Sequence, residues 1–309
     1  MPLPDLTPAD VCAIVVTFNP DDSSVECINT IIETAVHTVI IDNCSDESSR
    51  EKLRRFKGDK VTLVENGVNA GVAAGHNLGI QAATAKGFRW FLLFDQDTKI
   101  FPSTIQSLIR VYIDCSAELG DKLGMLGSNY YHLLEDGTIA EGKVPLCHGK
   151  LWSRENLIIT SGTLIGREKF ETIGLFREDF FIDHIDHDYC LRAQHRGLVI
   201  ARTALPLTIH RLGQLTTRRP WLALGKKKLL SCYSPLRRYY QIRNFITLAR
   251  EYEKEFPGVI SFIRNSIRRE TMRALKYEGR FRRNLMSVVL AFQHSRRGIS
   301  GKYAGRFAL

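Results

Sequence analysis

The first hundred residues contain four short runs of apolar residues, and a polar residue (Asn, Asp or Glu) follows each run. A short, unbroken apolar run bounded by polar residues is typical of a strand buried on both faces. The intervening segments have helical spacing of apolar residues or are rich in small residues. The predicted strands are 11–18, 38–41, 61–64 and 90–94, and the predicted helices are 22–36, 45–56 and 71–85. This alternation predicts an α/β fold with a parallel, helix-covered sheet.

The fourth run is followed by two carboxylates, Asp95 and Asp97. In an open parallel sheet, ligands bind beyond the carboxyl ends of the strands. If strand geometry continues past residue 94, both side chains lie on the same side, because strand side chains repeat every two residues. Two carboxylate ligands suit Mg²⁺ or Mn²⁺ shared with a substrate phosphate. The alternative is an Asp turn that simply ends the strand.

The ends of the first two predicted strands also carry short polar side chains, at Thr17, Asn19, Asp42 and Asn43. A pyrimidine base presents an imide N–H between two carbonyl acceptors, so a carboxylate and nearby amides could recognise it. Each of these residues alone could equally be a turn or a helix cap. Together with Asp95, they predict a nucleotide diphosphate site along this edge.

The segment that follows the third strand, residues 71–75, is rich in glycine and alanine. The chain contains neither the dinucleotide-binding GxGxxG pattern nor a P-loop. We therefore expect these small residues to let a helix pack closely on the sheet. Asn77 would point inward and make a polar contact.

Beyond residue 97 the pattern predicts a helix at 102–117, short strands and loops over 122–150, and a strand with a glycine kink at 158–165. Helices at 167–173 and 186–196 and a strand at 198–201 follow. Beyond about residue 220 the pattern is helical, amphipathic and basic. These features predict a catalytic domain at 1–220 and a basic helical region at 221–309.

A second carboxylate cluster, Asp183 and Asp186, precedes the helix predicted at 186–196. A transferase acting on a hydroxyl needs a carboxylate within hydrogen-bond reach to take its proton. The alternative is an acidic first turn that caps the helix. His184 and His187 do not form a zinc pattern. Further along, His210 could bind a metal or a phosphate, and Arg211 could neutralise a leaving diphosphate.

Composition limits the cellular setting. The seven cysteines are scattered and odd in number, which argues against a disulfide framework and favours a reducing, cytoplasmic compartment. The N-terminus does not resemble a signal peptide, and no segment has about 18 continuous apolar residues, the length that indicates a membrane span. Residues 211–309 hold 23 Lys and Arg against five Glu and no Asp, whereas residues 1–210 have a net charge of −8. The basic region predicts an anionic partner.

The ordered set of motifs resembles glycosyltransferase family 2. The set comprises residues 15–20, 41–45, 69–77, 94–97 and 183–186. More narrowly, the Asp95-Gln96-Asp97 form, residues 160–165 and residues 237–244 (Arg-Arg-Tyr-Tyr-Gln-Ile-Arg-Asn) are similar to the rhamnosyltransferase branch of that family. The resemblance covers about residues 10–250.

The resemblance implies the A-type glycosyltransferase fold, a Rossmann-like, mostly parallel sheet with flanking helices. It also implies a dTDP-β-L-rhamnose donor, Mg²⁺ or Mn²⁺ as cofactor, and inversion at the anomeric carbon. By position, Thr17, Asn19 and Asp42 contact the nucleotide, Asp97 is the direct metal ligand, and Asp186 is the general base. His210 matches a histidine near the metal or the diphosphate. The family's usual Glu-Asp pair is Ile185-Asp186 here, so Asp183 could take over part of the missing acid's role, in rhamnose recognition.

Donor and acceptor contacts are expected from the segment that contains Ser161, Gly162 and Asp183, together with Asn77 and Arg211. Relatives that build bacterial surface polysaccharides use polyprenyl-diphosphate acceptors, so the basic region predicts peripheral attachment to an anionic membrane. The alternatives are a solvated basic face that contacts a second copy of the chain, the same fold with a UDP- or GDP-linked donor, and a nucleic-acid-binding protein. The region lacks a known nucleic-acid-binding module, and the acidic catalytic part would repel phosphates in the absence of a metal ion, so we expect no nucleic acid partner.

Overall fold

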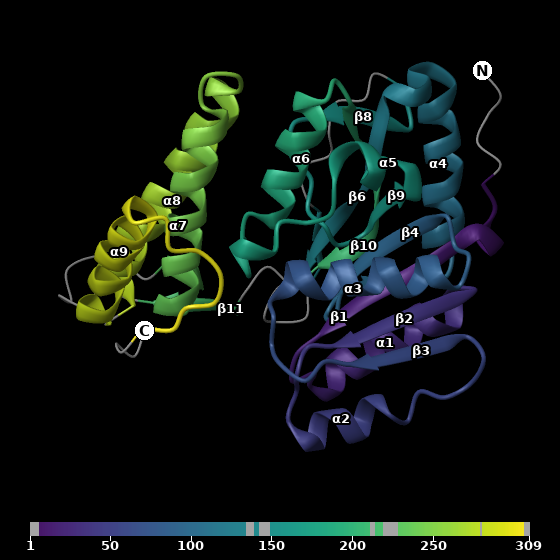
Figure 1. The fold of residues 1–309 in the computed structure, drawn as a ribbon, viewed down its shortest axis with the longest axis horizontal. Coiled ribbons are helices and arrows are strands. Elements are labelled where there is room, and N and C mark those ends of the chain that lie inside the picture. Colours follow the sequence, from purple (N-terminus) through teal and green to yellow (C-terminus); the bar gives the residue numbers. More distant parts are fainter. Residues whose placement is uncertain are drawn as a thin grey trace.

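The computed structural model describes residues 6–133, 139–141, 149–210, 214–218, 228–278 and 280–305. In this part of the chain, ten strands form one mixed sheet in the order β3-β2-β1-β4-β9-β6-β10-β5, with β7 beside β6 and β8 beside β10. Helices cover both faces of the sheet, and three further helices lie together beyond it (Figure 1). The predicted α/β class is confirmed.

The first four strands are parallel, as the alternating sequence pattern predicts, and lie in the sheet in the order β3-β2-β1-β4. They are β1 (Val11–Thr17), β2 (His37–Asp42), β3 (Val61–Glu65) and β4 (Trp90–Asp95). The connecting helices are α1 (Asp22–Thr34), α2 (Glu47–Leu53) and α3 (Val72–Ala85). Asp21 caps α1, because its carboxylate accepts a hydrogen bond of 2.7 Å from the backbone N–H of Ser24.

Successive residues of β1 point alternately into the hydrophobic cores on the two faces of the sheet, because strand side chains repeat every two residues. Ile14 and its neighbours on the same face pack with α3, α5 (Arg167–Ile173) and α6 (Ile185–His195). Val15 and the opposite face pack with α1, α2 and α4 (Thr104–Leu119). Both faces are therefore closed to water, and the ends of the strands are left for ligands.

The small residues of α3 bring that helix close to β1. A Cβ atom added to Gly79 would lie 2.3 Å from Cγ2 of Ile14, and one added to Gly75 would lie 2.6 Å from Cγ1 of Val16. Neither position has room for a side chain. The predicted close packing of this helix on the sheet is confirmed.

The second half of the sheet differs from the prediction in strand length. The segment expected to form short strands contains an 11-residue strand, β6 (Leu123–Leu133), and the strand expected at 198–201 is β10 (Val199–His210), which has 12 residues. The expected strand at 158–165 is only β9 (Thr163–Gly166), antiparallel to β4 and β6, and a turn at Gly162 precedes it. The short strands are β5 (Lys99–Ile100), β7 (Ile139–Glu141) and β8 (Trp152–Glu155), and three single-turn 3₁₀ helices are η1 (Pro8–Asp10), η2 (Gly120–Lys122) and η3 (Glu178–Phe180).

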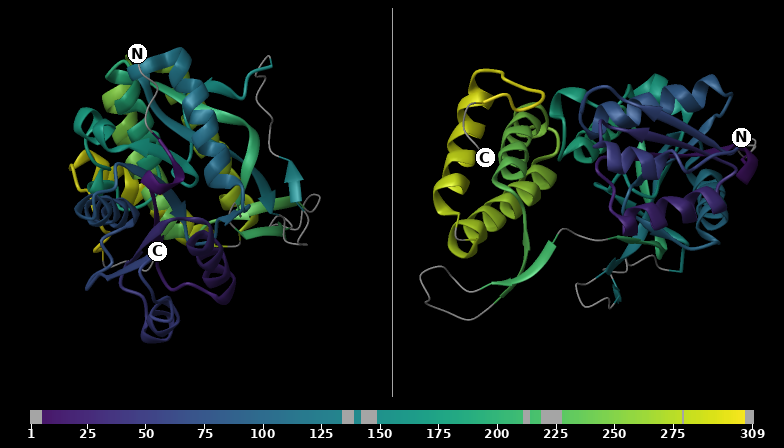
Figure 2. Two further views of the ribbon diagram at one scale, coloured as in Figure 1. Left: turned by 90° about the vertical axis from the view of Figure 1, so that its right-hand side faces the viewer. Right: turned by 90° about the horizontal axis from the view of Figure 1, so that it is seen from below.

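The C-terminal part is not entirely helical, because β11 (Gln214–Arg218) and β12 (Lys228–Cys232) pair before the helices begin. The helices are α7 (Pro235–Tyr252), α8 (Pro257–Tyr277) and α9 (Phe281–Arg296). Figure 2 shows them as a separate layer beside the sheet domain. Phe245, Leu248 and Ile260 nevertheless share the core that α6 forms with the sheet. The predicted boundary at 220/221 lies outside the described residues.

Candidate active site

Two strand ends bring together the predicted metal ligands. Asp95 is the last residue of β4, Asp97 lies in the turn after it, and His210 is the last residue of β10. One ligand atom from each of the three residues lies within 4.8 Å of the others. Strand geometry does not continue to Asp97, because β4 ends at Asp95 and the chain turns, with Thr98 N–H donating to the Asp95 carbonyl at 3.2 Å. The turn, rather than a continued strand, brings Asp97 near Asp95.

The donor set fits a divalent metal ion. Two carboxylates and an imidazole are ligands that divalent ions accept in proteins. Nδ1 of His210 is buried and has no hydrogen-bond partner among the described residues, although a buried polar atom normally has one. Tyr130, from the neighbouring strand β6, packs edge-on against the imidazole with ring centroids 5.9 Å apart. This contact holds the ring beside the two carboxylates.

Ser161 and Gly162 support the end of β4. The Ser161 hydroxyl accepts a hydrogen bond of 3.1 Å from Asp95 N–H and shares one of 2.6 Å with the Thr98 hydroxyl. Gly162 donates to the Leu93 carbonyl at 2.7 Å and has a φ of +78°, a conformation that favours glycine. These contacts fix the position of Asp95. Direct contact between this pair and a sugar stays a prediction.

The predicted nucleotide-binding residues meet where β1 and β2 end. Asp42 is fully buried, accepts hydrogen bonds of 3.2 Å from Ser45 N–H, and lies 3.4 Å from Nε of Arg50. Thr17 pairs with Asp42 in the sheet, and its hydroxyl donates to the Ile41 carbonyl. Asn19 has a φ of +46°, and its side-chain oxygen Oδ1 accepts a hydrogen bond of 2.8 Å from Asp46 N–H. These residues therefore form a connected polar edge beside Asp95.

Asn43 ties this edge to the loop before α3. Its amide donates to the Gly71 carbonyl at 3.0 Å and accepts from Ala70 N–H at 3.1 Å. The side-chain amide of Asn43 thus both donates and accepts hydrogen bonds within the protein. The contact between Asn43 and a nucleotide stays a prediction, and the structure gives the residue a role in shaping the loop.

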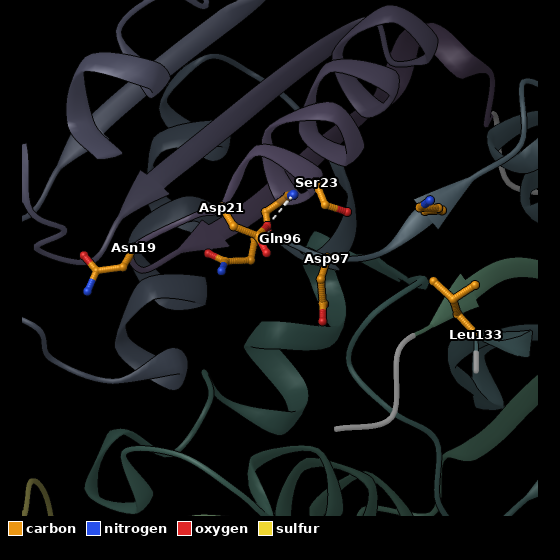
Figure 3. A pocket seen from close by; sticks show the side chains of 8 residues that line it. Asn19, Asp21, Ser23, Gln96, Asp97 and Leu133 are labelled. Carbon is orange, nitrogen blue, oxygen red and sulfur yellow. Dashed lines mark hydrogen bonds between the residues drawn. The ribbon is translucent and has the colours of Figure 1, made fainter. Parts of the chain in front are cut away.

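A cavity of about 190 Å³ opens beside Asp97. Figure 3 shows Asp97 and Gln96, from the turn after β4, and Asn19 and Asp21, from the β1–α1 connection, among the side chains that line it, with Gln96 next to Asp21. Gln96 also accepts a hydrogen bond of 2.8 Å from Phe18 N–H, which links the turn after β4 to the end of β1. Asp97 thus borders open space at the ligand-binding edge of the sheet.

The second carboxylate cluster lies on a loop with unusual backbone geometry. Phe181, Asp183 and His184 have φ values of 64°, 62° and 63°. Such conformations are costly for residues other than glycine and persist where surrounding contacts enforce them, often at functional sites. One contact is the hydrogen bond of 2.8 Å from Val72 N–H to the Phe181 carbonyl. The loop leads directly into α6, whose second residue is Asp186.

Helix α7 supplies most of the contacts that hold this loop. The Asn244 amide donates to the carbonyls of Phe180, Ile182 and Asp183 at 2.8–3.0 Å. The buried guanidinium of Arg243 donates to the carbonyl of Phe180, and also to those of Asp179 and Gly301. Sequence reasoning did not assign roles to Arg243 and Asn244. In the sequence, both residues are marked because they lie in the segment 237–244, which resembles the rhamnosyltransferase branch.

Electrostatics places the two carboxylate clusters in one site. Burial raises the pKa of Asp95, His210 and Arg237 lower it, and Asp97 and Asp186 raise it. Burial likewise raises the pKa of Asp183, which Arg237 opposes. Groups that perturb one another in this way are close in space. The site therefore combines Asp95, Asp97, Asp183, Asp186, His210 and Arg237.

Two predicted donor or acceptor residues are not brought into this cluster by any described contact. The Asn77 amide is buried, donates to the Phe176 carbonyl and to Glu178, and accepts from Phe176 N–H. It holds the segment before the Asp183 loop. Arg211 lies outside the described residues. His184 and His187 bond to each other, with Nδ1 atoms 2.8 Å apart, and no described third ligand makes them a metal site.

The chain is similar to known glycosyltransferases in sequence. Residues 12–118 match the model of glycosyl transferase family 2. Over 254 residues the chain is 28% identical to the dTDP-rhamnosyl transferase RfbF of Shigella flexneri, covering 79% of this chain and 81% of that protein. It is 23% identical over 212 residues to the low-salt glycan biosynthesis hexosyltransferase Agl10 of Haloferax volcanii, covering 65% and 67% of the two chains.

The fold is similar to solved structures at low sequence identity. GalNAc-T7, solved with UDP, GalNAc and Mn²⁺, matches with a TM-score of 0.59 and 11% identity, covering 94% of this chain and 58% of its own. S. aureus TarS 1–349, solved with UDP-GlcNAc, matches with a TM-score of 0.50 and 12% identity, covering 94% and 73%. These matches confirm the expected A-type glycosyltransferase fold.

Proposed function

We propose that this glycosyltransferase, whose residues 12–118 match the model of glycosyl transferase family 2, transfers L-rhamnose from dTDP-β-L-rhamnose to a glycan acceptor. The similarity to a dTDP-rhamnosyl transferase over most of both chains supports this donor. The observation that carries the chemistry is the meeting of Asp95, Asp97 and His210 with the Asp183–Asp186 segment at one edge of the sheet. The 1–220 segment would hold the catalytic residues, and the 221–309 region would complete the site and dock the enzyme.

The proposed reaction is a single displacement with inversion. Asp186 takes the proton of the acceptor hydroxyl as its oxygen forms a bond to the anomeric carbon. The bond from that carbon to the diphosphate oxygen breaks, and its electron pair leaves with dTDP. Asp186 lies in the first turn of α6, where the helix dipole favours a carboxylate. No covalent sugar–enzyme intermediate is needed.

The remaining residues bind and orient the donor. Asp42 and Thr17, with Asn19 beside them, would hold the base at the ends of β1 and β2. Asp95, Asp97 and His210 would hold Mg²⁺ or Mn²⁺, which supplies positive charge to the diphosphate when bound. The Ser161 hydroxyl keeps Asp95 in place through its hydrogen bond to the backbone.

Thermal unfolding with nucleotides tests the donor assignment. A ligand that binds only the folded protein raises the unfolding temperature by mass action. We expect dTDP with Mg²⁺ or Mn²⁺ to raise it, and dTDP without metal, or UDP and GDP with metal, to raise it less. A preference for UDP or GDP would contradict the donor and retain the enzyme class. No shift with any nucleotide would contradict the proposed function.

We also propose that the acceptor is lipid-linked and that the C-terminal helices dock on the cytoplasmic face of an anionic membrane. Among the described helices, none combines the length and apolar composition needed to span a membrane. Helix α9 instead exposes a stripe of apolar residues along one side, each about one turn from the next. The stripe consists of Phe281, Leu285, Val289 and Phe292. Arg282, Arg283, Arg296 and Arg297 are exposed beside it, as in helices that lie in a membrane interface.

The charge of this surface favours lipid over a second copy of the chain. Symmetric pairing of two α9 surfaces would bring their arginines together, and like charges oppose such contact. We expect the enzyme to sediment with phosphatidylglycerol vesicles and not with phosphatidylcholine vesicles, and salt to weaken this binding.

A Leu285→Ser/Phe292→Ser variant should reduce sedimentation, whereas Leu205→Ser, a change at a leucine on β10 that is even more exposed (68% against 44% for Leu285), should not. Concentration-dependent dimerisation that both α9 substitutions abolish, or preferential binding to duplex DNA, would contradict the membrane assignment.

A further inference from the structure

The described charged groups around the proposed diphosphate position are mostly negative. Asp95, Asp97, Asp183 and Asp186 all belong to this site, and a diphosphate adds further negative charge. A bound metal ion would offset part of that charge. An arginine is well suited to the rest, because its planar guanidinium can donate two parallel hydrogen bonds to phosphate oxygens.

We propose that Arg237, in the first turn of α7, binds the leaving diphosphate of the nucleotide sugar. This inference rests on the proposed function and adds a catalytic residue from the C-terminal helices. Residues 237–244 entered the sequence argument only as a family resemblance, and Arg211, the arginine expected to serve the diphosphate, lies outside the described residues. Arg237 is a second arginine, contributed by another element.

The contacts of Arg237 orient it in the site. Its Nε donates to both carboxylate oxygens of Asp183, at 3.1 and 3.2 Å. Its guanidinium carbon lies 5.0 Å from the centre of the Tyr233 ring. Among the described residues, its hydrogen bonds come from Nε alone, so the terminal nitrogens are available to a ligand. The guanidinium is therefore fixed through Nε, and its two terminal nitrogens are left for a ligand.

Arg237 also lies within electrostatic range of the metal-binding carboxylates. Its positive charge lowers the pKa of Asp95, and the charge of Asp95 raises the pKa of Arg237. Arg237 thus contacts Asp183 directly and lies within electrostatic range of Asp95. A donor diphosphate near the metal ligand Asp95, with its sugar near Asp183, would lie within reach of this guanidinium.

The neighbouring arginines of α7 cannot serve in its place. Arg238 and Arg243 are 1% and 2% exposed, whereas the Arg237 side chain is 45% exposed. Arg238 pairs with Glu278 at 3.0 Å, and Arg243 donates to the carbonyls of the Asp183 loop. The guanidinium groups of Arg238 and Arg243 are therefore buried and bonded to other parts of the protein. Arg237 is the arginine of this segment that faces the site.

The chemical role follows from bond breaking. As the bond between the anomeric carbon and the diphosphate oxygen breaks, its electron pair remains on the diphosphate. Donation from the terminal nitrogens of Arg237 stabilises this developing charge, and no proton is transferred because arginine stays charged. The residue should therefore affect binding of the diphosphate and the rate of transfer, and it should not affect binding of the nucleoside.

The test compares nucleotides that differ only in phosphate number. The dissociation constants of dTDP, dTMP and thymidine are measured by calorimetry with Mn²⁺, for the wild type and for Arg237→Gln and Arg237→Lys, and UDP, UMP and uridine are titrated in parallel. We expect Arg237→Gln to weaken the diphosphate about 10- to 100-fold, in line with a lost charged hydrogen bond, and to change the monophosphate and nucleoside less than about threefold. Arg237→Lys should restore part of the loss.

Arg264→Gln is the matched control. Arg264 is also in an ion pair, with Glu253, and its side chain is 46% exposed, but it lies on α8. It should leave all dissociation constants unchanged, and the unfolding temperature of each free variant checks the fold. Unchanged diphosphate binding in Arg237→Gln, or an equal loss for diphosphate, monophosphate and nucleoside, would overturn the inference. If the wild type binds neither dTDP nor UDP, the proposed function itself is overturned.

Discussion

Replacing Asp186 with Asn is expected to lower kcat about 10²- to 10⁴-fold while leaving dTDP binding close to that of the wild type. This range is the usual contribution of a general base. Asn has nearly the same shape, and its carbonyl can still accept the 2.8 Å hydrogen bond that the Asp186 carboxylate accepts from His187 N–H. The substitution therefore removes the ability to take a proton and keeps the first turn of α6.

The measurement is the rate of sugar transfer at saturating donor, with dTDP binding measured separately. Asp179→Asn is a suitable control. Asp179 lies on the same segment, and its carboxylate is paired with Arg177, whose Nε is 2.8 Å away. A variant at 186 with normal kcat would exclude Asp186 as the base. Asp183, the other carboxylate of the cluster, would then be tested by the same substitution.

Replacing Asp97 with Asn is expected to remove the metal-dependent part of dTDP binding and to lower kcat by about 10²- to 10³-fold, as loss of a charge-stabilising group in an active site does. Asp97 borders the open cavity, whereas Asp95 is tied to Ser161 through its backbone. Loss of Asp97 should therefore weaken the metal without disturbing the end of β4. Chelation of the metal should reproduce the effect in the wild type.

The increase in unfolding temperature produced by dTDP, with and without Mn²⁺, checks this result. Asp114→Asn, which changes an exposed carboxylate on α4, should retain the full metal-dependent increase. An Asp97→Asn variant that keeps that increase would remove Asp97 from the metal site. A variant that loses it and also unfolds at a lower temperature without ligand would point to a structural role instead.

The local sequence pattern was sufficient to predict the first four strands of the sheet, β1 to β4, and the helices between them. Each of these strands is a short apolar run, and the helices between them are marked by side-chain caps (α1 and α2) or by small residues (α3), so neighbours in sequence are neighbours in space. The polar residues at the strand ends could be located for the same reason. Asp95 and Asp97 stand at the end of the fourth strand, whereas Asp186 and His210 are singled out mainly by the family resemblance.

The second half of the sheet could not be predicted in this way because its strands depend on distant partners. β6 contains Gly124 and Gly127, which suggest loops in the sequence. In the structure a Cβ atom at Gly127 would lie 2.9 Å from the side chain of Ile158, so the glycine serves a long-range contact. β10 contains Pro206 and register shifts against β6, which hide its length.

The same limit applies to Arg237, whose role depends on where α7 packs. Its partner Asp183 is 54 positions earlier in the chain. No periodicity or spacing connects two residues so far apart. The sequence motif marked the segment, and only the fold showed which site it serves.

The hydrogen bonds from Asn244 and Arg243 to the strained loop at 180–183 limit how this enzyme can be divided or recombined. A fragment that ends before α7 would keep every strand of the large sheet and the aspartates themselves, yet it would lose the groups that hold Asp183 and the entry to α6 in their costly conformation. Exchange of C-terminal helices between related enzymes would carry the same penalty unless the loop and α7 were exchanged together. The loop at 180–183 and α7 are far apart in the sequence, yet they must change together if this active site is to be kept.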